Sequence, residues 1–188
     1  MPRLPRIQAE DAIYHVTANA ARQLLLFTDR ADRETFLRIL AIATSKAQWL
    51  CHSYCLMGTH FHLLLETPEP NIAYGMQRLN WLYSRSFNQR HGLRGHCFEG
   101  RYEAELIQSE RHFLNTARYV VRNPVEAGLC ESPVAWEWSS YRATVGLVEP
   151  PDFLYTQAVL SSFDDRAEVA RRLFRAFVEE PEPRRLVA

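Results

Sequence analysis

The sequence has almost no lysine: of its 22 basic residues only Lys46 is a lysine, and the others are arginines. Cysteine is also scarce, with four irregularly spaced residues, Cys51, Cys55, Cys97 and Cys130. This number excludes the dense disulfide framework of small secreted proteins, and we expect reduced thiols in a cytoplasmic protein. Cys51 and Cys55 with His52 lack a second matching pair of zinc ligands, so buried thiols are favoured over a zinc site.

Long apolar runs are missing as well. No stretch approaches the ~20 apolar residues that a transmembrane helix needs, and none follows the first arginines as in a secretory signal. We therefore expect neither a membrane partner nor secretion. Apolar residues make up 47% and charged residues 23% of the 188 residues, which is the composition of an ordinary globular protein.

The charge is zero overall but unevenly distributed. Residues 76–125 contain 8 arginines and 4 acidic residues, whereas residues 126–188 contain 7 arginines and 11 acidic residues. The planar guanidinium group suits bidentate phosphate contacts and stacking on bases. The basic middle of the chain is therefore a candidate nucleic-acid surface, although solvated helix faces would have a similar composition.

Alternating, aromatic and β-branched stretches predict four strands, at 12–18, 49–57, from 60 to just before Pro68, and at 101–108. Apolar residues at helical spacing predict helices at 32–48 with Asp32 as N-cap, at 72–90, from Ser109 as N-cap to Pro124, and at 164–179. The order strand–helix–strand–strand–helix–strand predicts an α+β, ferredoxin-like fold. Such a fold has a four-stranded antiparallel sheet with two helices on one face.

The third predicted strand contains the sequence His60-Phe61-His62. Successive side chains of a strand point to opposite faces, so the two histidines share one face with Leu64 while Phe61 faces the core. Two imidazoles held side by side are good ligands for a divalent metal ion. A His-x-His pair alone is a weak indication, because such pairs are common.

On the third predicted helix, Tyr119 and Asn123 are four residues apart and project from the same face. A tyrosine phenol becomes a useful nucleophile beside a divalent cation that polarises a phosphate. Asn123 could supply an oxygen ligand. The alternatives are a buried helix aromatic at Tyr119 and a C-terminal capping residue at Asn123.

These features, in this order, resemble the REP-associated tyrosine transposases, within the IS200-like single-tyrosine HUH transposases. The resemblance runs from Met1 to about Tyr141. It is carried by the histidine block together with residues 1–7, 14–17, 22–23, 88–91, 98–102, 118–129 and 138–141. It implies an HUH single-tyrosine transposase domain over residues 1–145. Pro150-Pro151 marks a linker before the last predicted helix, so we expect residues 146–188 to form a C-terminal helical extension.

The resemblance implies an endonuclease and strand transferase that cleaves and rejoins single-stranded hairpin DNA through a 5′-phosphotyrosine intermediate, without a nucleotide cofactor. Tyr119 would be the nucleophile, and His60, His62 and Asn123 would bind Mg²⁺ or Mn²⁺. The oligomeric state, monomer or homodimer, stays open. Candidate DNA-backbone contacts are Arg78, Arg85, Arg90, Arg94, Arg101, Arg118 and Arg122, with His91 and His96 assisting.

Two turns depart from the family pattern. The chain has Met57-Gly58-Thr59-His60 where the family usually has Met-Pro-Asn-His, and residues 18–21 replace a typical Arg-Gly-Asn turn. A second hypothesis is therefore a hairpin-DNA-binding protein with little or no catalysis. A third is an RNA-binding module built on an open four-stranded sheet, although the stacking-aromatic motif of that class is absent.

Overall fold

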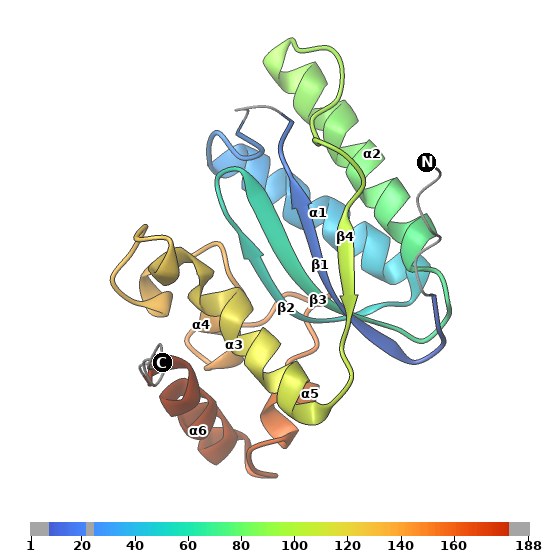
Figure 1. Ribbon diagram of the computed structural model, residues 1–188. Coiled ribbons are helices and arrows are strands. Elements are labelled where there is room, and N and C mark those ends of the chain that lie inside the picture. Colours follow the sequence, from blue (N-terminus) through green and yellow to red (C-terminus); the bar gives the residue numbers. More distant parts are fainter. Residues whose placement is uncertain (1–7, 22–24, 181–188) are drawn as a thin grey trace, which may run out of the picture.

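The computed structural model describes residues 8–21 and 25–180, so the family-like blocks at 1–7 and 22–23 lie outside the described residues. Its centre is an antiparallel sheet of four strands in the order β2-β3-β1-β4 (Figure 1). The strands are β1 (Ala12–Asn19), β2 (Leu50–Leu56), β3 (His60–Thr67) and β4 (Glu103–Leu106). The predicted α+β, ferredoxin-like fold is confirmed.

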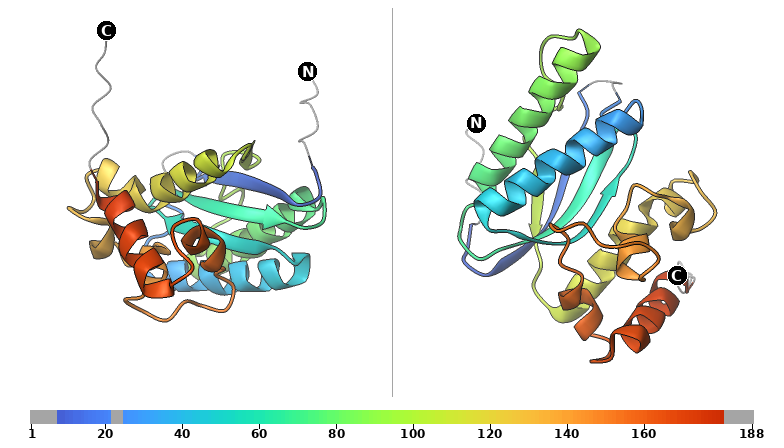
Figure 2. Two further views of the ribbon diagram at one scale, coloured as in Figure 1. Left: turned by 90° about the horizontal axis from the view of Figure 1, so that it is seen from below. Right: turned by 180° about the vertical axis from the view of Figure 1, so that it is seen from behind.

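Helices α1 (Arg30–Ala47) and α2 (Ile72–His91) cover one face of the sheet, as Figure 2 shows from two further directions. The main hydrophobic core lies between them and the sheet. There, Phe36 of α1 and Tyr83 of α2 meet Phe61 of β3, and all three side chains are fully or almost fully buried. The alternation predicted for β3 is confirmed, because Phe61 points into this core while His62 points to the other face.

Helix α3 (Glu110–Glu126) covers the opposite face (Figure 2). Phe113, Ala117 and Val121 follow one another at helical spacing and pack on Leu64 of β3 in a second hydrophobic cluster. Ser109 is the N-cap of α3, as predicted, and its side chain accepts a hydrogen bond from His112 N. The face of β3 that carries the histidines is therefore covered by α3.

Much of the chain after α3 packs against this second cluster, whereas Ala143 and Leu154 reach the main core. This part of the chain forms a short 3₁₀ helix, η1 (Pro133–Ala135), and the helices α4 (Tyr141–Thr144), α5 (Gln157–Ser161) and α6 (Ala167–Glu179). Phe174 and Val178 of α6 are buried there, and Tyr141 donates a hydrogen bond to Glu179 over 2.8 Å. None of the helices in the described ranges is long and apolar enough to cross a membrane.

Several helix boundaries differ from the prediction. Helix α1 begins at Arg30, and its N-cap is Asp29 rather than Asp32. Asp29 accepts a hydrogen bond from Asp32 N, as an N-cap does, and Asp32 in turn accepts one from the backbone N–H of Thr28, the residue before the cap. Helix α6 begins at Ala167 rather than Asp164, because the Asp164 carboxylate binds Arg166 N in a local turn instead.

The prediction that Pro124 ends α3 is wrong by two residues. Pro124 lies inside the last turn, where its missing N–H removes a single helical hydrogen bond. The helix ends at Glu126, and Gly128, two residues later, has a left-handed φ of 69°. Gly128 N donates to Val125 O and Leu129 N donates to Pro124 O, which together form a Schellman motif. Asn123 therefore keeps a helical backbone and its place one turn after Tyr119.

Candidate active site

The two histidines lie at the start of β3, beside the end of β1. Asn19 pairs with His60 and Thr17 pairs with His62 in the antiparallel register. The two imidazole centroids are 4.9 Å apart, with ring planes almost perpendicular at 87°. His60 is partly exposed and His62 is buried, so the pair runs from the surface into the molecule.

Tyr119 of α3 lies over this pair. Its ring centroid is 5.5 Å from that of His62, with the rings edge to face. Because 43% of the Tyr119 side chain is exposed, the alternative of a buried helix aromatic is wrong. The exposed tyrosine and His62, 57 residues apart in the chain, therefore lie side by side in the fold, with the tyrosine open to solvent.

His15 of β1 is a part of this site that sequence reasoning missed. Its Nε2 lies 3.0 Å from Nδ1 of His62, and its ring centroid is 5.7 Å from that of Tyr119. The only indication in the sequence is that His15 is a polar residue in a strand otherwise suited to a sheet. Nothing in the sequence gives the register that brings His15 beside His62.

The histidines are electrically neutral near pH 7. The pKa of His62 is lowered to about 3, mainly by burial and also by the neighbouring His15 and His60, while Asn123 opposes the shift. Burial also lowers the pKa of His60, again opposed by Asn123, and that of His15. Neutral imidazoles keep a lone pair, which is the form that binds metal ions.

The donor set fits a divalent metal ion. His62 Nε2 is buried and makes no well-formed hydrogen bond with any described residue, so a buried donor or acceptor site is left open. Asn123 interacts with both His60 and His62, which places an amide beside the two imidazoles. Within the described part of the chain no three His, Cys, Asp or Glu side chains are grouped for metal binding, and the amide of Asn123 is the group beside the two imidazoles that could add an oxygen donor.

The altered turn before His60 is well ordered by hydrogen bonds. Gly58 O accepts from Leu26 N and Phe27 N over 2.9 and 3.2 Å. The Thr59 hydroxyl lies 3.1 Å from His60 Nδ1. If Nδ1–H donates to this hydroxyl, the lone pair of His60 is on Nε2. In that tautomer Thr59 orients the imidazole of His60, although it differs from the usual residue of the family.

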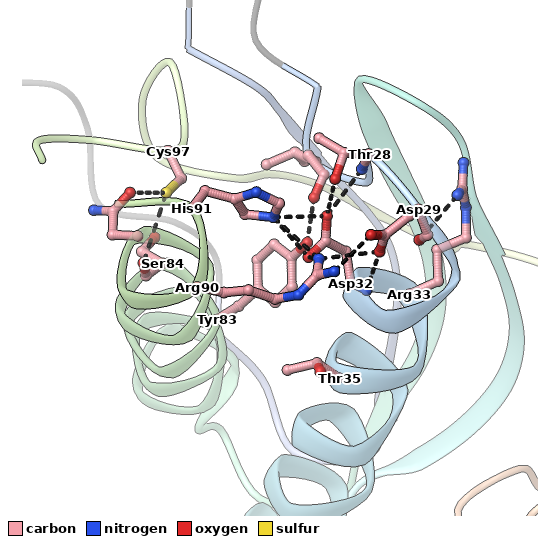
Figure 3. A network of polar contacts seen from close by, with 12 residues as sticks. Thr28, Asp29, Asp32, Arg33, Thr35, Tyr83, Ser84, Arg90, His91 and Cys97 are labelled. Carbon is pink, nitrogen blue, oxygen red and sulfur yellow. Dashed lines mark hydrogen bonds and ion pairs between the residues drawn. The ribbon is translucent and has the colours of Figure 1, made fainter. Parts of the chain in front are cut away.

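The seven candidate arginines do not form a single cluster, and three of them are engaged within the protein. Arg90 forms ion pairs with Asp29 and Asp32 over 2.6 and 2.5 Å (Figure 3). Arg118 donates to Glu180 O, and Arg122 donates to Val178 O over 2.7 Å. These contacts tie α2 to α1 and α3 to α6. The other four candidate arginines are exposed: Arg78, Arg85, Arg94 and Arg101.

The four cysteines are free, and three of them are buried. Burial raises the pKa of the Cys51 thiol to about 12 and also raises that of Cys55. Cys51 packs in the main core, whereas Cys55 packs against Met57 and Val120. The prediction that the Cys51 and Cys55 thiols are buried is confirmed.

A tyrosine beside two neutral histidines on a ferredoxin-like sheet is the arrangement that the resemblance implies, and comparison with known proteins identifies the family. The model of the IS200-like transposase family matches residues 8–123, which is more than half of the chain. The protein belongs to the IS200-like transposases. No curated protein matches the sequence.

One solved structure has a similar fold over most of its length. It is described as the REP-associated tyrosine transposase bound to a REP hairpin. The TM-score is 0.68 at 15% sequence identity, over 82% of this chain and 92% of that chain. At this identity the similarity shows that the two proteins share a fold.

Proposed function

We propose that this protein is a metal-dependent endonuclease and strand transferase that cleaves and rejoins single-stranded hairpin DNA. The observation that supports this most directly is the position of Tyr119, which reaches from α3 to the His60–His62 pair on β3 and stays exposed. The family membership supports DNA transposition, and the hairpin in the similar structure supports the substrate class.

In the proposed reaction, the Tyr119 hydroxyl oxygen attacks the scissile phosphorus in line. The new bond joins the tyrosine oxygen to the 5′ phosphate, and the bond from phosphorus to the 3′ oxygen breaks. The phenol proton passes to solvent, and the leaving oxygen takes up a proton to become a 3′-OH. Rejoining is the reverse reaction with a second 3′-OH, so each step exchanges one phosphodiester for another without ATP.

His60, His62 and Asn123 would hold Mg²⁺ or Mn²⁺ in this proposal. The bound ion would polarise a non-bridging phosphate oxygen and stabilise the charge that develops in the transition state. The chain itself keeps both imidazoles neutral and leaves Nε2 of His62 without a hydrogen-bond partner among the described residues. The Tyr119 side chain is positioned by the packing of α3 on Leu64, two residues after His62.

Four of the predicted DNA-binding arginines are free to meet the phosphate backbone: Arg78, Arg85, Arg94 and Arg101. Arg90, Arg118 and Arg122 could contact DNA only in addition to their present partners or by giving them up. We therefore assign the first four the larger share of backbone binding.

The first test replaces the nucleophile. Tyr119→Phe should abolish the covalent protein–DNA adduct formed with a labelled hairpin oligonucleotide and Mn²⁺, because phenylalanine has no oxygen to attack phosphorus. The adduct is measured on a denaturing gel. Tyr155→Phe is a matched control, since Tyr155 is similarly exposed at 40% and should keep full activity. An undiminished adduct in Tyr119→Phe would show that the nucleophile is another residue.

The second test removes the metal. Addition of EDTA should stop cleavage while leaving hairpin binding measurable by fluorescence anisotropy, and Mn²⁺ should restore cleavage. His60→Ala combined with His62→Ala should lose Mn²⁺ binding in calorimetry. Cleavage that continues in EDTA would contradict the metal role of both histidines.

Hairpin binding without catalysis is the second candidate function, and the two altered turns favour it. The Thr59–His60 contact weighs against it, because the altered turn still orients the imidazole. Salt-dependent hairpin binding with no adduct under Mg²⁺ or Mn²⁺ would select this alternative.

We also propose that residues 1–145 are the transposase domain and that residues 146–188 are an extension that supports α3. The support for this division is the burial of Phe174 and Val178 of α6 in the same cluster as Phe113 and Val121 of α3. In that arrangement the extension contributes to the position of Tyr119 without touching the substrate.

A further inference from the structure

A groove runs between α2 and the segment that leads into β4. Figure 1 shows this segment returning from the end of α2 toward β4. The cavity has a volume of about 1150 Å³, and it is lined by one side of α2, by residues 95–101 and by Ala21; the lining residues of α2 are Asn80, Trp81, Ser84, Arg85 and Asn88. This volume is ample for a nucleotide.

One wall of the groove is an exposed aromatic ring. Trp81 is 56% exposed, whereas Tyr83 and Phe87 of the same helix are buried in the core. The Arg85 guanidinium lies 5.6 Å from the centre of the Trp81 ring, one helical turn further along. Aromatic rings beside cations are the platforms on which unpaired bases stack in proteins that bind single strands.

The groove also offers positive charge. Arg85 and Arg101 line it, and neither forms an ion pair with a described residue. Arg90, which is five residues beyond Arg85, is in contrast neutralised by two aspartates. Glu99 is the single carboxylate among the residues of the walls. The groove therefore suits an anionic ligand with a flat ring, which describes a nucleotide of a DNA strand.

The walls are joined to each other by hydrogen bonds. Asn88 Nδ2 donates to Gly95 O over 2.9 Å, and the Cys97 thiol donates to Asn88 Oδ1 over 3.1 Å. Because both contacts link α2 to the segment opposite, the groove is preorganised, and binding needs little ordering of the protein.

The groove adjoins the candidate active site through the backbone. Glu99 N donates to Asn19 O over 3.0 Å, and Asn19 pairs with His60 in the sheet. Because β1 lies between them, His60 is two strand spacings, roughly 10 Å, from the segment that forms the groove. The two sites are close enough to bind successive parts of the same DNA strand.

We propose that this groove binds an unpaired nucleotide of single-stranded DNA, with its base stacked on Trp81 and its phosphate held by Arg85 and Arg101. This inference rests on the proposed function for the identity of the ligand as DNA. It adds a specific subsite for the unpaired part of the substrate, apart from the duplex of the hairpin.

The test measures binding without cleavage, by fluorescence anisotropy in EDTA. A short labelled oligothymidylate serves as the unpaired probe and a blunt hairpin as the duplex probe. Trp81→Ala should weaken binding of the oligothymidylate by about 5- to 150-fold, which is the effect of losing one stacked base. Binding of the blunt hairpin should change little, and Trp81→Phe should keep most of the affinity.

Tyr74→Ala is the matched control, because Tyr74 is an exposed aromatic residue of the same helix, at 60% exposure, and does not line the groove. It should bind both probes like the parent. Equal binding by Trp81→Ala and the parent, or equal losses in Trp81→Ala and Tyr74→Ala, would overturn the proposal. Tighter binding of the matching oligouridylate would overturn the assignment to DNA.

The two proposals fail in different ways. If the parent forms the Tyr119 adduct but oligothymidylate binding does not depend on Trp81, the groove proposal alone is wrong. If binding depends on Trp81 but no adduct forms under any metal, the groove proposal stands and the proposed cleavage is wrong.

Discussion

Each imidazole of the candidate metal pair has a neighbour at its Nδ1. Thr59 lies beside Nδ1 of His60, and His15 lies beside Nδ1 of His62. Metal-binding histidines commonly use the second ring nitrogen for such a contact, which fixes the tautomer and the ring orientation. With Nδ1–H as the donor in both cases, Nε2 of both rings is free to bind an ion.

The contact between His15 and His62 leads to a prediction about metal affinity. His15→Gln should weaken Mn²⁺ binding by about 10- to 100-fold, because the orientation of His62 is lost while the two ligands remain. The affinity is measured by calorimetry or by electron paramagnetic resonance of free Mn²⁺. The exposed His96 provides the control His96→Gln, which should bind Mn²⁺ like the parent. Unchanged affinity in His15→Gln would show that His62 needs no support from β1.

At this scale the sequence predicted the common face of His60 and His62, because side-chain alternation is a local property of a strand. It could not predict the contact of His15 with His62, which depends on the register between β1 and β3. The hydrogen bond from Arg118 to Glu180 O could not be predicted either, since the acceptor is a backbone atom 62 residues away in the chain.

At the scale of elements, the start of α1 is joined to the end of α2 by a buried carboxylate. Asp32 is 2% exposed, and it accepts hydrogen bonds from Thr28, from Arg90 and from His91 (Figure 3). Burial alone would raise the pKa of Asp32, but these hydrogen bonds outweigh it and lower the pKa to about 2. The ionised carboxylate is therefore more stable in the folded state than in the unfolded chain.

This shift predicts a loss of stability in acid. A folded pKa of about 2, below the unfolded value of 3.8, gives stability that is present above about pH 4 and is lost as pH falls through about 2. Asp32→Asn should lower the free energy of unfolding at pH 7 by about 2 kcal/mol and should remove this part of the pH dependence. Urea unfolding across a pH series measures both effects.

Asp29→Asn is the control for Asp32→Asn. Asp29 has a 47% exposed side chain, and asparagine caps a helix as well as aspartate does. Asp29→Asn should therefore lower the free energy of unfolding at pH 7 by less than Asp32→Asn does. A larger loss in Asp29→Asn than in Asp32→Asn would contradict the central role of Asp32.

The order and type of the main elements were predictable because their hydrophobic periodicity is strong. Their ends were less predictable. Asp29 and Asp32 are both suitable N-cap residues in the sequence. The ion pair of Asp32 with Arg90 of α2, which the sequence does not reveal, explains why Asp32 is buried between the helices while Asp29 caps α1. Pro124 is usually read as the end of a helix, but it is tolerated here because the Schellman motif at Gly128 completes the last turn.

At the scale of the whole molecule, α6 acts as a support for α3. Phe174 is 1% exposed and lies 5.8 Å from Phe163 and 6.4 Å from Tyr141, measured between ring centroids. Arg118 and Arg122 of α3 donate to backbone carbonyl groups at the end of α6. The helix that carries Tyr119 is thus held between the sheet and the C-terminal part of the chain.

This arrangement predicts that the core of the extension affects the distant site. Phe174→Ala should lower the free energy of unfolding by about 3–5 kcal/mol, as expected for a large buried aromatic residue. The temperature at which hairpin cleavage stops should fall with it. Leu173→Ala, at a neighbouring position that is 39% exposed, should change both measurements much less. Equal stability of Phe174→Ala and the parent would show that α6 does not support α3.

The register of β1 against β3 has a consequence for the synthesis of the protein. The candidate site combines residues of three elements that are far apart in the chain: His15 of β1, His60 of β3 and Tyr119 of α3. These residues meet only when α3 packs on the finished sheet. A nascent chain that has not yet released α3 from the ribosome has the histidines but no tyrosine beside them. By our proposal, the ability to cut DNA therefore appears only at the end of folding, and an incomplete or unfolded copy is harmless to the genome that encodes it.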